Sequence, residues 1–279
     1  MADWHDEVFN DRVRFGLKIR RSLYSGQSPY QKIDIFESEQ FGRTLTLDGI
    51  YMTSEGDEYF YHEMLVHPAM TTAPLIRRIL IIGGGDGGTA REVLRYSEVE
   101  RVVMVEIDSM VVEACKEYLP SIGTAWDDPR LEVVIQDGVA YVKEAQEEPF
   151  DVILLDGSDP VGPAEGLFGE DFYHGCERLL QPEGVFALQS ESPVLFWDVF
   201  LSIVRTLRKI FGRADPYFGS VPIYGAGMWT WTYATRSVDP MMIIGERIER
   251  VEPLTRYYNR EIHEAAFALP TEIKKELER

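Results

Sequence analysis

The spacing of hydrophobic residues along the chain changes near Pro74. Over residues 14–53, apolar and polar positions alternate, and glycine-containing turns interrupt the alternation. An Asp-Gly step at 48–49, with a short apolar run on each side, is typical of a β-hairpin. Residues 58–71 then carry apolar and aromatic side chains in a pattern that suits a helix. Together these patterns predict a small N-terminal antiparallel β-subdomain with a linking helix over residues 1–73.

Beyond Pro74, short apolar runs alternate with segments of helical pattern. Runs of strand length occupy residues 78–82, 101–105, 131–135, 152–155 and 184–188. The segments expected to be helical are 88–96, 109–119, 139–146, 170–180 and 196–211. Strands that alternate with helices in this way build a parallel, doubly wound α/β sheet. Residues 74–279 are therefore predicted to form one α/β domain.

The acidic composition argues against one class of partner. The 279 residues include 28 lysines and arginines against 47 aspartates and glutamates, which gives a formal net charge of −19. A surface of this charge repels phosphate backbones, so we expect no nucleic-acid partner and an attraction for small cations. Net charge alone is equally explained by solubility.

We expect a cytoplasmic protein without a membrane anchor or a metal. The N-terminal residues lack the basic and apolar regions of a signal peptide, and no apolar run is long enough to span a bilayer. The two cysteines, Cys115 and Cys176, lie in apolar periodic segments and do not have the spacing of a metal site or a disulfide framework.

Residues 150–168 bring two carboxylates to the end of one predicted strand. Residues 152–155 are continuously apolar, as in a strand that is covered on both faces. Asp156 and Asp159 follow where glycines and prolines stop the strand. Ligands of open α/β sheets bind beyond the carboxyl ends of the strands. Taken alone, this stretch is also explained as a polar loop that caps the next helix.

Acids follow the other predicted strands as well. Asp86 lies in the glycine-rich loop after the first strand, Glu106 ends the second, and Asp137 ends the third. The Asp137-Gly138 pair alone is also typical of a plain turn. Because the carboxyl ends of parallel strands meet at one edge of a sheet, all of these acids are expected on the same rim.

The glycine run at 83–88 matches the Gly-x-Gly-x-x-Gly pattern of dinucleotide sites, and Glu106 stands where an acid binds ribose hydroxyls. Asp86, however, lies inside the loop, where a pyrophosphate would cost on the order of several kcal/mol in charge repulsion. The loop therefore favours a cationic nucleoside without phosphates, such as an S-adenosyl sulfonium compound. Asp86 and Asp156 together would repel the carboxylate of S-adenosylmethionine and attract the ammonium of its decarboxylated form.

Together these motifs resemble the polyamine aminopropyltransferases, the family of spermidine synthase. The residues that carry the resemblance are Gly83–Gly88, Arg91–Val93, Glu106–Asp108, Asp137–Gly138, Asp156–Ala164, Leu47–Gly49, Asp57–Glu63, Tyr257–Asn259 and Ala265–Phe267. The resemblance covers nearly the whole chain. It implies a small N-terminal β-subdomain on a Rossmann-like core of the S-adenosyl-methyltransferase type, assembled as a homodimer or homotetramer.

By this resemblance, the chain transfers the aminopropyl group of decarboxylated S-adenosylmethionine to putrescine and releases spermidine and methylthioadenosine, without a prosthetic group or a metal. Asp156 is implied as the catalytic proton acceptor. The residues implied for the donor are Gln31, Asp86, Glu106, Asp137, Gly138 and Pro163. Those implied for the amine are Tyr61, His62, Asp86, Asp156, Gly157, Ser158, Asp159 and Tyr224.

Two departures from the family pattern leave alternatives open. Gly157 stands where the family often has serine, and a loop that contains Tyr224 ends in the bulky Met228 and Trp229. Both lie near the predicted amine site, so cadaverine, agmatine or spermidine stay open as acceptors. An S-adenosylmethionine-dependent amine N-methyltransferase on the same fold is a further alternative.

Overall fold

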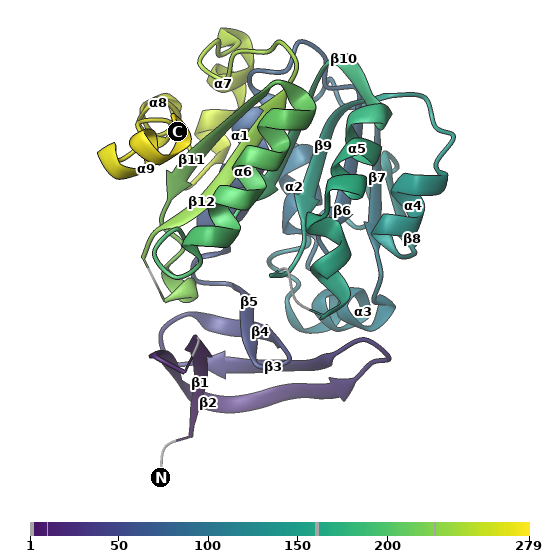
Figure 1. Cartoon of the computed structure of the whole chain (residues 1–279). Coiled ribbons are helices and arrows are strands. Elements are labelled where there is room, and N and C mark those ends of the chain that lie inside the picture. Colours follow the sequence, from purple (N-terminus) through teal and green to yellow (C-terminus); the bar gives the residue numbers. More distant parts are fainter. Residues whose placement is uncertain (1–2, 10, 160–161, 226) are drawn as a thin grey trace.

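Two β-sheets form the frame of the protein (Figure 1). The computed structural model describes residues 3–9, 11–159, 162–225 and 227–279. Within these residues, the N-terminal sheet has five strands and the larger sheet has seven.

The N-terminal sheet is an antiparallel meander whose strands lie in chain order. Its strands are β1 (Trp4–Phe9), β2 (Val13–Gln27), β3 (Lys32–Ser38), β4 (Gly42–Leu47) and β5 (Ile50–Ser54). Leu47 pairs with Ile50 around a two-residue turn, in which Asp48 and Gly49 have φ of 49° and 87°. Two positive φ values match the right-handed twist of hairpin strands, which explains the Asp-Gly pair. The β-subdomain and this hairpin are confirmed, whereas β1 was not predicted.

The larger sheet has the strand order β11-β12-β10-β9-β6-β7-β8. Its strands are β6 (Arg78–Gly83), β7 (Arg101–Glu106), β8 (Leu131–Ile135), β9 (Phe150–Asp156), β10 (Leu180–Gln189), β11 (Arg213–Gly219) and β12 (Trp229–Thr235). β6 to β10 run parallel, and β11 and β12 form an antiparallel pair at one edge. The doubly wound, Rossmann-like sheet is confirmed. The β11–β12 pair was not predicted.

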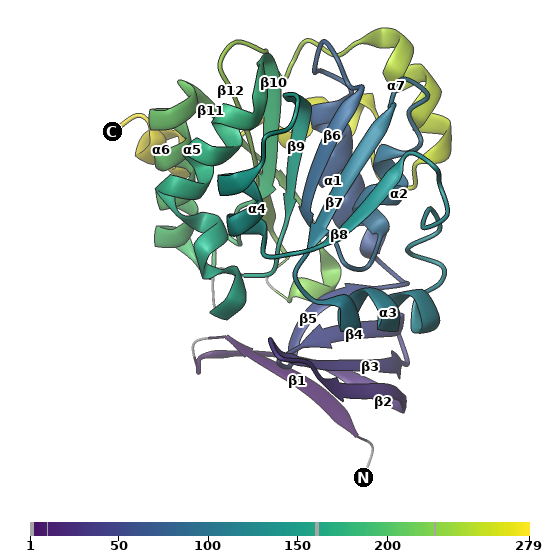
Figure 2. The same cartoon turned by 90° about the vertical axis from the view of Figure 1, so that its right-hand side faces the viewer.

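Helices cover both faces of the larger sheet (Figure 2). One face carries α4 (Gly138–Glu144), α5 (Glu170–Leu179) and α6 (Trp197–Phe211), and the other carries α1 (Glu58–Met70), α2 (Gly88–Val93) and α7 (Gly245–Val251). Alternate residues of β6 pack on opposite faces of the sheet. Leu80 and Ile82 pack toward α4–α6, whereas Ile79 and Ile81 pack toward α1 and α2. Burial on both faces is the reason why the strand is apolar throughout.

The two sheets are joined through α3 (Ser109–Tyr118) and α1. Val111 and Cys115 of α3 pack against Ile33 and Leu45 of the N-terminal sheet. α1 is buried along almost its whole length and packs against α2, β9 and β10. The predicted helix at 58–71 is confirmed, and it delivers its residues to the junction between the sheets. The division of the chain at residue 73 stays a prediction.

The remaining elements pack around this frame. They are the helices α8 (Arg260–Ala266) and α9 (Thr271–Leu277) and the 3₁₀ segments η1 (Gly162–Phe168), η2 (Pro222–Tyr224) and η3 (Glu252–Leu254). Among the described residues, no helix is both long and apolar enough to cross a bilayer.

Candidate active site

The site lies where the strand order of the larger sheet reverses, between β6 and β9. Gly83 at the end of β6 pairs with Asp156 at the end of β9, and the Gly84 N–H donates to the Asp156 carbonyl at 3.0 Å. Gly83 has φ 83°, and a Cβ there would collide with that carbonyl oxygen. Only glycine therefore lets the loop turn this close to β9. Such a switch point opens a crevice at the carboxyl ends of the strands.

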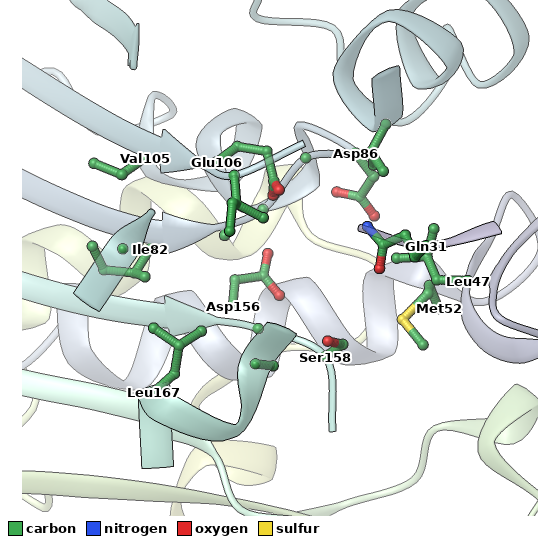
Figure 3. Close-up of a pocket in the computed structure, with 18 of the residues that line it drawn as sticks. Gln31, Leu47, Met52, Ile82, Asp86, Val105, Glu106, Asp156, Ser158 and Leu167 are labelled. Carbon is green, nitrogen blue, oxygen red and sulfur yellow. The ribbon is translucent and has the colours of Figure 1, made fainter. Parts of the chain in front are cut away.

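A pocket, here called the strand-end pocket, occupies this crevice (Figure 3). Figure 3 shows the carboxylates of Asp86, Glu106 and Asp156 around one space, the first from the loop after β6 and the others from the ends of β7 and β9. The sequence-predicted site residues in its lining are Gln31, Tyr61, His62, Asp86, Glu106, Asp137, Gly138, Asp156, Gly157, Ser158 and Tyr224. Pro163 belongs to η1, but its side chain lies outside the described part of the structure.

Apolar side chains complete the walls of the strand-end pocket. Ile82, Val105, Val139 and Leu167 come from the larger sheet and its helices, and Met52 comes from the N-terminal sheet. Flat apolar walls beside a few polar groups suit an aromatic base. Sequence reasoning did not identify these residues, because an apolar residue at the end of a strand does not differ from a core residue in its pattern.

Glu106 and Gln31 lie together on one side of the strand-end pocket. The Glu106 carboxylate accepts a 2.9 Å hydrogen bond from the Asp108 N–H, and burial raises its pKa to about 7. Asp108 caps α3 and also accepts from the Gln31 side-chain amide at 3.1 Å. The amide nitrogen of Gln31 is thereby held, which leaves its oxygen for the pocket. The arrangement provides acceptors for adjacent hydroxyl groups.

Asp137 and Gly138 begin α4. The Asp137 carboxylate caps the helix by accepting from the Ala140 N–H at 2.9 Å. Both residues also line the strand-end pocket. Asp137 therefore has both a local role, as the cap of α4, and a place in the pocket. One carboxylate can cap a helix with one oxygen and offer the other to a ligand.

Asp86 and Asp156 both lie close to the imidazole of His62. The Asp86 carboxylate accepts from the Gly88 N–H at 2.8 Å, and its second oxygen is 3.3 Å from Nε2 of His62. Burial opposes ionisation of Asp86, but His62 outweighs it and lowers the pKa to about 2. The Asp156 carboxylate accepts from the Thr89 hydroxyl at 2.6 Å, and burial raises its pKa. One acid is therefore a fixed anion, and the other is suited to gain and lose a proton.

The ligand atoms of His62, Asp86 and Asp156 all lie within 4.8 Å of one another, a spacing that a metal ion could bridge. Although burial opposes the charge on His62, Asp86 and Glu58 raise its pKa well above the usual range. A protonated imidazole has no lone pair for a metal. The chemistry of this group favours an organic cation, and the absence of a metal stays a prediction.

A second pocket, here called the inter-sheet pocket, adjoins the first. The two share Met52, Tyr61, Gly157, Ser158 and Tyr224 in their linings. The aromatic and aliphatic residues found only in the inter-sheet pocket are Phe9, Ile50, Tyr51, Phe196 and Trp229. The rings of Tyr61 and Tyr224 lie 5.9 Å apart, edge to face, at the junction. Aromatic side chains at this junction suit contact with an alkyl chain.

The far part of the inter-sheet pocket is acidic. Asp159, predicted from the sequence, lines it together with Glu7 of β1 and Gln189 of β10. Burial raises the pKa of Asp159, and burial raises that of Glu7 to about 7. Glu191, just after β10, lies beside Asp159, and burial raises its pKa to about 9. Buried acids without a cation are costly, so this cluster is built for a positive group.

Glu191 has an unusual backbone. Its φ is 69°, and the conformation is held because its carbonyl accepts from the Thr230 N–H at 3.1 Å and its N–H donates to the Gln189 side chain at 2.9 Å. Neither of its carboxylate oxygens has a hydrogen-bond donor among the residues that the structure describes. A buried polar group without a partner and a non-glycine residue in the left-handed region both point to a functional position.

Sequence reasoning missed Glu7, Gln189 and Glu191. Glu7 lies on a strand that was not predicted, and the other two follow the apolar run of β10 without a glycine or proline to mark them. One signal was available: an acid at the carboxyl end of β10 is consistent with the acids on the other strand ends.

The fold and this rim of acids define an enzyme on a Rossmann-like core of the S-adenosyl-methyltransferase type. The model of the spermine/spermidine synthase domain matches residues 58–241, and that of the spermidine synthase tetramerisation domain matches residues 3–55. A polyamine aminopropyltransferase of Prochlorococcus marinus (strain MIT 9313) is 53% identical over 232 residues, which is 83% of this chain and 80% of the relative. One from Thermoanaerobacter sp. (strain X514) is 43% identical over 98% of both chains.

Solved structures agree with these matches. A spermidine synthase in complex with the transition-state analogue AdoDATO has a TM-score of 0.95 and 41% identity, with 100% of this chain and 97% of that chain covered. The spermidine synthase of Thermotoga maritima has a TM-score of 0.93 and 41% identity, with 100% and 96% covered. The chain belongs to the spermine/spermidine synthase family of polyamine aminopropyltransferases and is a transferase.

Proposed function

We propose that the chain transfers the aminopropyl group of decarboxylated S-adenosylmethionine to putrescine and forms spermidine and methylthioadenosine. The observation that carries the proposal is that the two pockets are adjacent and share part of their lining. The strand-end pocket offers apolar walls and acids for a cationic nucleoside, and the inter-sheet pocket beside it has a second set of acids. Two adjacent acidic pockets suit a donor and a diamine that meet at their shared wall.

In the donor complex, Glu106 and Gln31 would accept hydrogen bonds from the ribose hydroxyls. Asp137 and Gly138 would contact the adenine. Asp86 would hold the ammonium of the aminopropyl group, where a carboxylate on the donor would be repelled. Pro163 stays a predicted contact. Each role is a proposal that rests on where these side chains lie in the strand-end pocket.

At the junction, Asp156 would accept a proton from the attacking amine. This amine is otherwise an ammonium ion at neutral pH and has no free electron pair. The neutral nitrogen then forms a bond to the methylene next to the sulfonium. The C–S bond breaks, and methylthioadenosine leaves with the electron pair on sulfur. Positive charge disappears at sulfur as it appears on nitrogen, so Asp86, the acid that stays ionised after Asp156 has taken the proton, stabilises the displacement.

The other end of the diamine would reach the acids of the inter-sheet pocket. Asp159 and Glu7 would accept hydrogen bonds from its ammonium, and Glu191 would add negative charge beside Asp159. Tyr61 and Tyr224 would exclude water around the alkyl chain, and Ser158 and Gly157 would line its path. His62 would act through Asp86 rather than touch the amine.

A product assay with defined donors and amines tests the proposal. We expect spermidine and methylthioadenosine from decarboxylated S-adenosylmethionine and putrescine, with lower kcat/KM for cadaverine, agmatine and spermidine. Methyl transfer from S-adenosylmethionine to putrescine would instead support an amine N-methyltransferase. A higher kcat/KM with another amine would keep the aminopropyl transfer and change only the acceptor.

We also propose that the chain assembles as a homodimer or homotetramer in the cytoplasm. The match of residues 3–55 to a tetramerisation domain supports assembly through the N-terminal sheet. Trp4, Val8 and Val13 expose apolar surface on that sheet. Light scattering coupled to size exclusion distinguishes a monomer from either assembly.

A further inference from the structure

His62 is fixed on three sides in the wall of the strand-end pocket. Its Nδ1 is 2.7 Å from the Glu58 carboxylate and its Nε2 is 3.3 Å from that of Asp86. Gly88, the first residue of α2, lies against the ring so closely that a Cβ there would collide with it. The side chain is 2% exposed, so solvent does not compete for these contacts.

Glu58 is itself held by Arg91 of α2. The guanidinium contacts both carboxylate oxygens, at 2.7 and 3.1 Å, and donates to the Ile122 carbonyl at 2.9 Å. Its Nε is 2.8 Å from the buried carboxylate of Glu92. Charges therefore alternate from Asp86 through His62, Glu58 and Arg91 to Glu92.

Only the first members of this charge chain reach the ligand. His62 and Asp86 line the strand-end pocket, whereas Glu58 and Arg91 lie behind them, outside its lining among the described residues. A two-point contact between an arginine and a carboxylate fixes orientation as well as charge. Glu58 and Arg91 are thus placed to act on the site through His62.

We propose that Glu58 and Arg91 are positioning residues that hold His62 as a cation beside Asp86 and thereby keep Asp156 free to accept the proton of the amine. The inference rests on the proposed role of Asp156. Neither Glu58 nor Arg91 is expected to touch the donor or the amine.

The charged and titratable groups that face His62 support this role. They come from the N-cap of α1 (Asp57), α1 itself (Glu58 and Tyr61), the loop after β6 (Asp86) and the end of β9 (Asp156), while Arg91 of α2 acts through its contact with Glu58. Burial favours a neutral imidazole, but the carboxylates of Asp86 and Glu58 raise the pKa of His62 well above its usual value. Burial and the charge of Asp86 raise the pKa of Asp156, and the cation on His62 opposes both.

Loss of the charge on His62 would leave Asp86 and Asp156 to repel each other. The pair would then keep a proton to higher pH, and Asp156 could not accept another from the amine. A substitution of Glu58 or Arg91, which lie behind the pocket wall, is therefore expected to shift the pH dependence of the reaction.

The test is Glu58→Gln, which keeps the shape of the side chain and removes its charge. We expect the pKa of His62 to fall far enough for the imidazole to lose its charge on the acid limb of the reaction, measured by NMR titration of labelled histidine with the signal assigned through His62→Gln. The acid limb of kcat/KM for the amine should move up by about one pH unit, with methylthioadenosine affinity within about threefold of the parent.

Glu63→Gln is the matched control. Glu63 lies on the same helix, is also buried, and accepts 2.8 Å hydrogen bonds from the N–H groups of Arg256, Tyr257 and Tyr258. Its loss should destabilise the fold without moving the His62 titration or the acid limb. An acid limb that moves equally in both variants, or in neither, would overturn the proposal.

The unmodified enzyme provides a second measurement if Glu58→Gln does not fold. We expect the His62 imidazole to stay doubly protonated well above the pKa of a free histidine. A neutral His62 at about pH 7 would refute the proposal. Normal turnover of Asp156→Asn would instead remove the proposed proton acceptor, while the His62 titration would still report on Glu58.

Discussion

The strand-end and inter-sheet pockets both gather acids, but they stabilise those acids differently. In the strand-end pocket, Asp86 and Asp137 accept backbone hydrogen bonds, Asp156 accepts from the Thr89 hydroxyl, and His62 supplies a cation within the protein. Burial raises the pKa of Glu7 and Asp159 in the inter-sheet pocket and of Glu191 beside it, and Glu191 has no hydrogen-bond donor among the described residues.

The difference shows what each pocket requires from its ligand. The strand-end pocket is compensated in part before a ligand arrives, because His62 keeps Asp86 ionised, whereas burial still raises the pKa of Glu106 and Asp156. The inter-sheet pocket lacks its compensating cation, so an ammonium group has a large effect there. We expect donor recognition to depend on placement and amine recognition to depend on charge.

The largest effect is expected at the junction of the two pockets. Asp156→Asn removes the proposed proton acceptor and keeps the shape of the side chain. We expect kcat to fall by about 10²-fold or more, as is usual for the loss of a general base. Methylthioadenosine affinity, measured by calorimetry, should change little, since other acids hold the nucleoside. A near-normal kcat would show that Asp156 does not accept the proton.

The next largest effect should distinguish the role of the inter-sheet pocket from that of the strand-end pocket. Glu7→Gln removes a charge from the inter-sheet pocket only, so we expect KM for putrescine to rise about tenfold or more, in line with a lost charge-assisted hydrogen bond. KM for the donor should stay within about twofold. Steady-state kinetics with each substrate varied in turn measures both. Equal changes in the two KM values would contradict the division of roles between the pockets.

The same comparison explains which parts of the fold and of the site could be predicted from the sequence. Asp86, Glu106, Asp137 and Asp156 could be predicted because each follows an apolar strand, and parallel strands end at one rim. The larger sheet was predictable for the same reason, apart from β11 and β12. In β12, Trp229–Thr235, threonines alternate mainly with aromatic residues. Both kinds of residue are buried, and an alternating pattern does not by itself indicate a strand that is buried on both faces.

The inter-sheet pocket was less predictable because it is assembled from distant parts of the chain. Glu7, Asp159 and Glu191 come from β1 and from the ends of β9 and β10, and no local pattern links them. Asp159 was found only because it follows Asp156. The positive φ of Glu191 depends on hydrogen bonds to Gln189 and Thr230, which only the folded chain brings together.

A smaller effect is expected from Asp86→Asn, which tests selection by charge in the strand-end pocket. Removal of this carboxylate reduces the repulsion of a donor that carries its own carboxylate. We expect the preference for decarboxylated S-adenosylmethionine over S-adenosylmethionine, measured as a ratio of inhibition or binding constants, to fall about five- to tenfold. An unchanged ratio would mean that shape rather than charge excludes the carboxylated donor.

The smallest effect is on stability, and it has a definite sign. Burial raises the pKa of Glu191 to about 9 from an ordinary value of 4.5. Between these values the folded chain binds more protons than the unfolded chain, so the contribution of Glu191 to stability is present below about pH 4.5 and is lost as pH rises toward 9. Glu191→Gln does not titrate in this range. The variant should therefore gain stability relative to the parent as the pH is raised.

We expect the Tm of Glu191→Gln minus that of the parent to increase from about pH 5 to about pH 8.5, since about 1 kcal/mol shifts Tm by roughly 2–4 °C for a chain near this size. Scanning fluorimetry across the pH range measures the difference. Saturating putrescine with methylthioadenosine should shrink it, because the bound ammonium supplies the missing cation to the parent. A difference that does not depend on pH, or that the diamine leaves unchanged, would mean that Glu191 is buried for packing and that the inter-sheet pocket is as fully compensated as its neighbour.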